Sequence, residues 1–148
     1  MLQSLIIAIF VLFNVALASN STYNSASAIS FANKYCAKDD EWLCAEFVAR
    51  SLQAGGEFSG CTNFGSCEGY NLKYVSQLHK ALLANGWYQS AGEAYNCGSA
   101  GDVLIYNIDG DSDAHAAFAL GSCLLDQHNP SRCSHSSNWG PNIVLSKK

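Results

Sequence analysis

The sequence predicts one α+β domain, in which helices from the first half pack on an antiparallel sheet formed by the second half. Three observations support this prediction. Apolar residues recur at helical spacing as far as about residue 83, and short apolar and β-branched runs bounded by Gly and Asp follow from residue 102. Seven cysteines all follow an apolar N-terminal segment, which predicts a disulfide-stapled chain. Helices followed by strands are typical of α+β folds, whereas a parallel sheet requires the two to alternate.

Residues 1–18 have the features of a cleavable signal peptide. An apolar run over residues 5–13 leads to Ala16-Leu17-Ala18, which fits the small-residue rule of signal peptidase. We therefore expect cleavage after Ala18 and a mature domain over residues 19–148. The run is shorter than the roughly 20 residues of a membrane span, but no Lys or Arg precedes it, so an uncleaved anchor is the alternative.

The cysteine count is odd. Export would carry all seven cysteines into a compartment where thiols oxidise, so we expect a secreted, extracellular protein. Three disulfides leave one thiol over, and a leftover cysteine in a secreted protein indicates an intermolecular bond or a reactive thiol.

The net charge and the sequence motifs limit the classes of molecule that the protein can bind. The formal net charge of −4 and a pI near 5.4 provide no basic surface for nucleic acid or anionic lipid, so we expect neither, and no membrane contact after signal cleavage. Asn20 begins an Asn-Ser-Thr motif and is the expected glycosylation site, because Pro130 disqualifies the motif at Asn129. The oligomeric state cannot be predicted from these features.

Two helices are predicted near the mature N-terminus. The first covers residues 28–35, and its apolar face consists of Ala28, Phe31, Ala32 and Tyr35. The second begins at or just before Cys44, continues to Leu52 and stops at the glycine pair 55–56.

The rest of the chain is predicted as a loop, a third helix and four strands. Residues 57–70 have no apolar period and form the loop, which Cys61 and Cys67 are expected to clamp. The third helix covers residues 72–83 and ends at an Asn-Gly pair. The predicted strands are residues 102–106, 115–120, 123–127 and 142–145.

Cys44 is predicted to lie at a helix N-terminus, where a thiol can act as a nucleophile. The positive end of a helix dipole favours the thiolate, which is the nucleophilic form of cysteine. An imidazole that takes the proton and a polar side chain that orients the imidazole complete such a site. His115 and the polar residues 126–129 follow in a workable order. The alternatives are that Cys44 is a half-cystine paired with Cys36 or a later cysteine, and that His115 is a structural histidine bonded to backbone.

No metal or cofactor is expected. Asp109, Asp111 and Asp113 have the spacing of the start of a calcium loop, but the glycine due next and the closing glutamate are missing, so a solvated acidic turn is the preferred interpretation. Zinc is disfavoured because no CxxC pair occurs and export favours disulfides.

Five pieces of the chain, in order, carry a resemblance to a known family. They are residues 44–56 (CAEFVARSLQAGG), Trp87, residues 101–106 (GDVLIY), residues 115–121 (HAAFALG) and residues 127–132 (QHNPSR). This set resembles the papain-like amidase and endopeptidase superfamily of bacterial cell-wall enzymes, in particular its amidase, CHAP and NlpC families. The resemblance implies a papain-like fold without a cofactor and a cysteine hydrolase that cleaves amide or peptide bonds in peptidoglycan. Such a secreted enzyme would serve in wall remodelling, digestion or antibacterial defence.

The resemblance also implies roles for single residues. Cys44 becomes the nucleophile and His115 the general base, with His128 preferred as the third residue and Gln127 or Asn129 as alternatives. The backbone N–H of Cys44 would stabilise the oxyanion, with Trp42 as the nearest upstream side-chain donor. Since Cys44 is then left unpaired, the disulfide cysteines are the other six: Cys36, Cys61, Cys67, Cys97, Cys123 and Cys133.

Two departures from the family pattern support a second interpretation. Members commonly carry Asp or Ser before the nucleophile, where this chain has Leu43, and Thr-Asn or Ser-Gly after it, where this chain has Ala45-Glu46. The alternative is therefore a catalytically inactive, disulfide-rich binding or defence module on the same scaffold.

Overall fold

The computed structural model describes residues 22–38, 42–92, 97–108, 114–136 and 140–148. The predicted signal peptide, the predicted glycosylation site at Asn20 and the acidic turn from Asp109 to Asp113 lie outside the described residues.

Three helices are present where the sequence predicts them. They are α1 (Ser25–Tyr35), α2 (Cys44–Ala54) and α3 (Val75–Ala84). The side chain of Asn24 caps α1 by accepting a hydrogen bond from the Ser27 N–H at 2.9 Å. The third helix begins three residues later than predicted, because the Asn71 side chain accepts the Lys73 N–H at 3.2 Å and holds a turn there.

All strand pairs of the single sheet are antiparallel, as predicted. The order is β1-β6-β2-β3-β4-β5. The strands are β1 (Tyr88–Ala91), β2 (Val103–Tyr106), β3 (His115–Gly121), β4 (Leu124–Gln127), β5 (Arg132–Ser136) and β6 (Ile143–Ser146). The architecture is therefore α+β, with the helical part first in the chain.

The sequence did not predict β1 and β5, the two edge strands. Both lie largely in solvent, and their residues, YQSA and RCSHS, lack the apolar run that marks a buried strand. Edge strands without a buried face are held by one row of backbone hydrogen bonds, which leaves little trace in the side chains.

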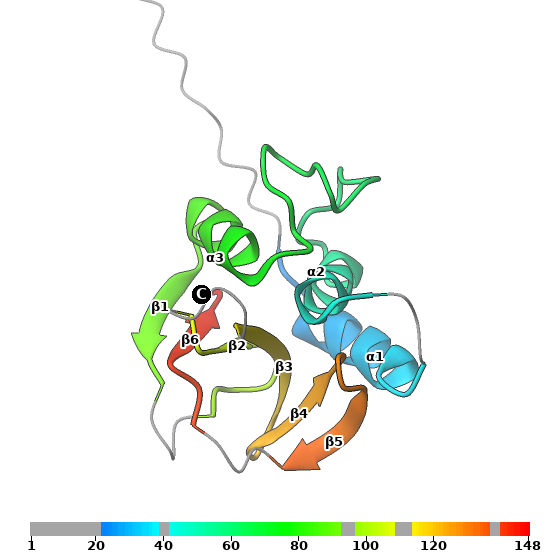
Figure 1. Ribbon diagram of the computed structural model, residues 1–148, viewed down its shortest axis with the longest axis vertical. Helices are drawn as coiled ribbons and strands as arrows, with labels where there is room; N and C mark the ends of the chain where they lie inside the picture. The colour runs from blue at the N-terminus through cyan, green and yellow to red at the C-terminus, as the bar shows by residue number, and fades with distance from the viewer. Residues whose placement is uncertain (1–21, 39–41, 93–96, 109–113, 137–139) are drawn as a thin grey trace, which may run out of the picture.

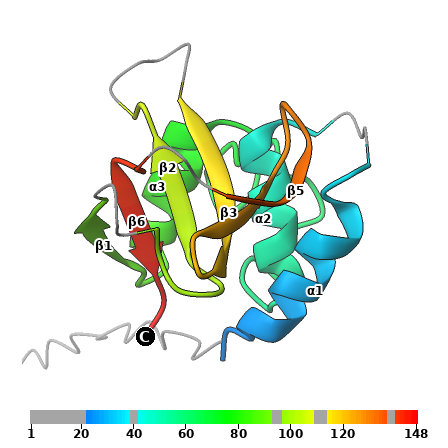
Figure 2. The ribbon, with the colours of Figure 1, turned by 90° about the horizontal axis from the view of Figure 1, so that it is seen from below.

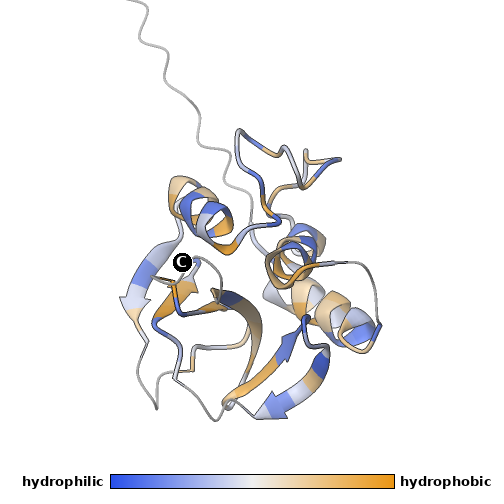
Figure 3. Ribbon diagram, in the orientation of Figure 1, coloured by the Kyte–Doolittle hydropathy of each residue, from blue (hydrophilic) through white to orange (hydrophobic). Residues whose placement is uncertain are grey.

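The helices lie together on one side of a curled sheet (Figures 1 and 2). The main core lies between them, where Phe47 and Leu52 of α2 pack with Phe118 of β3. A second cluster occupies the other face of the central strands and includes Leu104 and Ala117. Apolar residues accordingly make up most of β2, β3 and β6 (Figure 3), because both faces of these strands are largely buried.

Three disulfides tie separate parts of the fold together. Cys36–Cys133 joins the end of α1 to β5, Cys61–Cys67 closes the loop after α2, and Cys97–Cys123 joins two loops beside the sheet. The expected pairing within the loop and the set of six paired cysteines are confirmed. Such bridges are typical of proteins that fold in an oxidising compartment. Among the residues that the structure describes, no helix has the length and hydropathy of a membrane span.

Candidate active site

Cys44 is the unpaired cysteine, and it is the first residue of α2. Leu43 precedes it in extended conformation as the N-cap and makes no side-chain capping bond. The side chain of Cys44 is buried in the core between the helices and the sheet, while Leu43 is exposed. Cys44 lies at the helix start, as predicted. The structure shows in addition that its surroundings are hydrophobic.

Two opposing effects act on the Cys44 thiol. Burial raises its pKa, whereas hydrogen bonds from the backbone N–H groups of Ala116, Ala45 and Cys44 itself lower it. Burial is the larger effect, so the resting residue is a neutral thiol. The N–H groups at the helix start favour the thiolate, as expected, but burial outweighs them in the resting protein.

His115 begins β3 opposite Tyr106 of β2, and its ring is oriented by Gln127 of β4. Its Nε2 lies 3.2 Å from the Gln127 Oε1. The Gln127 amide nitrogen donates to the Pro130 carbonyl oxygen at 3.3 Å, which fixes the amide so that its oxygen faces the ring. Since an amide oxygen only accepts, the His115 Nε2 carries the proton and Nδ1 is the basic nitrogen.

Burial lowers the pKa of His115, and the bond to Gln127 offsets part of that effect. The imidazole is therefore neutral at neutral pH, as a general base must be. The Cys44 thiol and the His115 imidazole are therefore both uncharged in the resting protein.

Cys44 and His115 are linked through Ala116. The N–H of Ala116, the residue bonded directly to His115, is one of the groups that lower the pKa of the Cys44 thiol. Strand alternation directs Ala116 to the helix side of the sheet and His115 to the other side, with Tyr106. Within the described part of the chain, no hydrogen bond joins the thiol to the imidazole. The two groups approach the β3 backbone from opposite faces.

His128, the preferred third residue, does not bond to His115. Its ring lies between Phe47, at 4.2 Å between centroids, and Trp42, at 5.9 Å. Its Nε2 is 2.9 Å from the Tyr35 carbonyl oxygen. Gln127, and not His128, lies beside His115, because successive residues here face opposite sides of the sheet. Which residue acts as the third member of the site stays a prediction.

The other alternative, Asn129, is exposed in left-handed conformation with φ of 55°. It follows the end of β4, so the ladder no longer positions it beside β3. Gln127 therefore remains the one of the three candidates whose side chain contacts the His115 ring.

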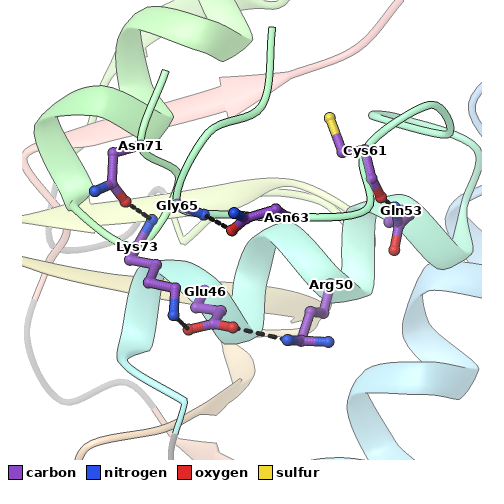
Figure 4. Close-up of polar contacts among 8 residues, drawn as sticks. All are labelled: Glu46, Arg50, Gln53, Cys61, Asn63, Gly65, Asn71 and Lys73. Atoms are coloured by element: carbon purple, nitrogen blue, oxygen red, sulfur yellow. Dashed lines mark hydrogen bonds and ion pairs between the residues drawn. The ribbon is translucent and has the colours of Figure 1, made fainter. Parts of the chain in front are cut away.

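Glu46 and Arg50 of α2 form a charged cluster with Lys73, and Arg50 of this cluster packs on the Trp42 ring. The cluster was not predicted from the sequence. Glu46 is buried and accepts ion pairs from Arg50 at 2.8 Å and Lys73 at 3.3 Å (Figure 4). The Arg50 guanidinium lies 4.3 Å from the Trp42 ring centre and 4.7 Å from that of Phe64. The sequence signal was the i, i+4 spacing of Glu46 and Arg50. Trp42 thus packs against Arg50 and His128, and its predicted oxyanion role stays a prediction.

Comparisons of this chain with models of protein families, with curated proteins and with solved structures return no match. The papain-like resemblance therefore remains a prediction carried by the five sequence pieces and by the residues just described.

Proposed function

We propose that the protein is a secreted cysteine hydrolase that cleaves amide or peptide bonds. The observation that carries the proposal is Cys44, the unpaired thiol at the start of α2, held against the backbone next to a histidine whose ring Gln127 orients. Peptidoglycan is the substrate class that the sequence resemblance implies.

The protonation states favour a general-base mechanism. His115 Nδ1 takes the proton of the Cys44 thiol as the sulfur attacks the carbonyl carbon. The reaction does not start from a preformed thiolate–imidazolium pair. The N–H groups at the start of α2 then donate to the oxyanion. His115 returns the proton to the leaving amine, and water resolves the thioester.

The mechanism requires a rearrangement at β3. Thiol and imidazole must come into contact, and catalytic hydrogen bonds are often long before substrate binds. His115 begins its strand, so its side chain has freedom that a mid-strand residue lacks. We expect substrate binding to bring the thiol and the imidazole into contact while Gln127 still holds the imidazole in the tautomer with a basic Nδ1.

A specific observation favours the second function, an inactive binding or defence module. Cys44 is buried with a raised pKa and has no hydrogen bond to an imidazole among the described residues. A scaffold that had lost catalysis would keep its disulfides and its core in this form.

Hydrolysis of purified peptidoglycan and of soluble muropeptides, followed by mass spectrometry of the products, separates the two functions. The chain offers a matched control, because His79 and Gln89 form a second, exposed His–Gln pair at 2.8 Å. We expect the wild type and His79→Ala to release the same products, and Cys44→Ala and His115→Ala to release none.

Two results would contradict the enzyme. One is the absence of cleavage of any peptidoglycan tested by a folded wild-type protein, and the other is activity retained in Cys44→Ala. Binding to peptidoglycan without cleavage, unchanged in Cys44→Ala, would support the inactive module.

A further inference from the structure

The Cys36–Cys133 disulfide lies against a buried carboxyl group. One carboxylate oxygen of Asp126 and the two sulfurs all lie within 4.8 Å of one another. Asp126 has no exposed surface, and its Oδ1 accepts the Ser134 N–H at 2.7 Å. Its Oδ2 is buried without a hydrogen-bond partner in the described structure. An unsatisfied buried oxygen is costly and indicates a role other than packing.

The two residues of this bridge differ in exposure. Cys133 is exposed on the edge strand β5, whereas Cys36 is 2% exposed at the end of α1. We therefore infer that an external thiolate attacks at the exposed Cys133 and that the sulfur of the buried Cys36 leaves. In such an exchange the partner attacks Cys133, and the buried Asp126 carboxyl group lies beside Cys36, the sulfur that leaves.

We propose that Cys36–Cys133 is a thiol–disulfide exchange site in which Asp126 is the acid–base group, separate from the Cys44 site. A dithiol partner attacks Cys133 through one thiolate and forms a mixed disulfide. The electron pair of the broken S–S bond goes to Cys36, which takes the Asp126 proton. The second thiol of the partner then releases Cys133, so the bridge gains two electrons and the dithiol becomes a disulfide.

The same steps in reverse close the bridge. Ionised Asp126 removes the proton of the Cys36 thiol, which attacks the mixed disulfide on Cys133. A buried thiol needs such a base, because burial disfavours its thiolate.

The electrostatics of Asp126 suit both directions. Burial raises its pKa, while the Ser134 N–H and the charge of His128, just after the same strand, lower it. The end of α1 brings the Cys36 sulfur to this carboxyl group, and β5 brings the Cys133 sulfur and the Ser134 N–H. Because its pKa lies above that of an ordinary aspartate, the carboxyl group can donate a proton in mildly acidic solution.

The test measures opening of the bridge in the folded mature protein. A Cys44→Ser background removes the competing free thiol. The protein is treated with dithiothreitol from mildly acidic to neutral pH, quenched with iodoacetamide and mapped by peptide mass, and each rate is divided by the thiolate fraction of the reagent. Asp126→Asn is compared with Asp102→Asn, a second buried aspartate that accepts the Ser99 N–H at 2.8 Å.

We expect the normalised rate for Cys36–Cys133 to rise as the pH falls in the parent protein and to stay flat in Asp126→Asn. At mildly acidic pH the Asn variant should open this bridge on the order of 100-fold more slowly, while Asp102→Asn matches the parent. The profile of the parent alone tests the proposal if Asp126→Asn does not fold. A flat profile in the parent, equal rates in both proteins, or opening of all three bridges together with unfolding would overturn it.

Discussion

At the residue scale, Cys44 shows how burial and a helix terminus compete. Three backbone N–H groups favour its thiolate, yet the hydrophobic surroundings raise its pKa overall. His115, also buried, has its pKa lowered. The two pKa values shift in opposite directions, and each shift favours the uncharged form of its group. The pair therefore begins the proposed reaction without charge.

Alkylation of Cys44 should accordingly depend on pH at high values. Because burial raises the thiol pKa, iodoacetamide labelling of the folded, unreduced protein should be slow at neutral pH. The rate should keep rising above the ordinary thiol range of about 8.5. Peptide mass mapping over a pH series measures this, and a rate that levels off below neutral pH would show a preformed thiolate.

Gln127 should matter through His115. In Gln127→Ala the ring loses the partner that fixes its tautomer, so hydrolysis should fall on the order of 100-fold in kcat, as for a misplaced catalytic group. The control is Gln89→Ala, which removes the same bond from the exposed His79. Equal activity in the two variants would mean that Gln127 does not orient the base.

The choice among residues 127–129 could not be made from the sequence. Three consecutive polar residues differ only in the face that each presents, and a shift of one position reverses all faces. The β3–β4 ladder shifts register between Ala119 and Gly121, and the β4–β5 ladder shifts between Leu125 and Gln127. Such irregularities leave no simple pattern in the sequence, although Cys44 and His115 could be selected from their positions at element starts.

At the scale of elements, the helices and buried strands were predictable because their apolar residues repeat. The start of α3 and the two edge strands were not, since a side-chain turn and one-sided backbone bonding determine them. The packing of α1 against the end of α2 could also not be predicted from the sequence. It depends on Gly55, whose missing side chain makes room for Tyr23.

Gly55→Ala tests that contact. A Cβ on Gly55 would lie 2.7 Å from a Tyr23 ring carbon and 2.8 Å from the Asn24 carbonyl oxygen, so the chain before α1 must move. We expect a loss of about 1–3 kcal/mol in the free energy of unfolding, as for overpacking. Gly60→Ala is the control, because a Cβ there meets nothing within 4 Å. Urea denaturation of both variants measures the difference, and equal midpoints would contradict the packing role of Gly55.

At the scale of the whole molecule, the disulfides should contribute unequally to stability. Cys36–Cys133 spans 97 residues and Cys61–Cys67 spans 6. In the chain-entropy model, closing the longer loop restricts the unfolded chain more.

The paired substitution Cys36→Ser/Cys133→Ser should lower the free energy of unfolding by about 4–5 kcal/mol, against about 2 kcal/mol for Cys61→Ser/Cys67→Ser. Denaturant unfolding of both double variants, without reductant, gives the comparison. A larger loss from the short loop would show that local strain or packing, and not chain entropy, governs these bridges.

The length of chain that the Cys36–Cys133 disulfide closes also determines what a proteolytic cut does to the protein. Cys44, His115 and Gln127 all lie within the 97-residue span that it closes. A single backbone cut anywhere in that span leaves two fragments that are still covalently joined, with the candidate site held on one connected molecule. A nicked protein would therefore migrate as an intact chain on a non-reducing gel and separate into fragments only after reduction.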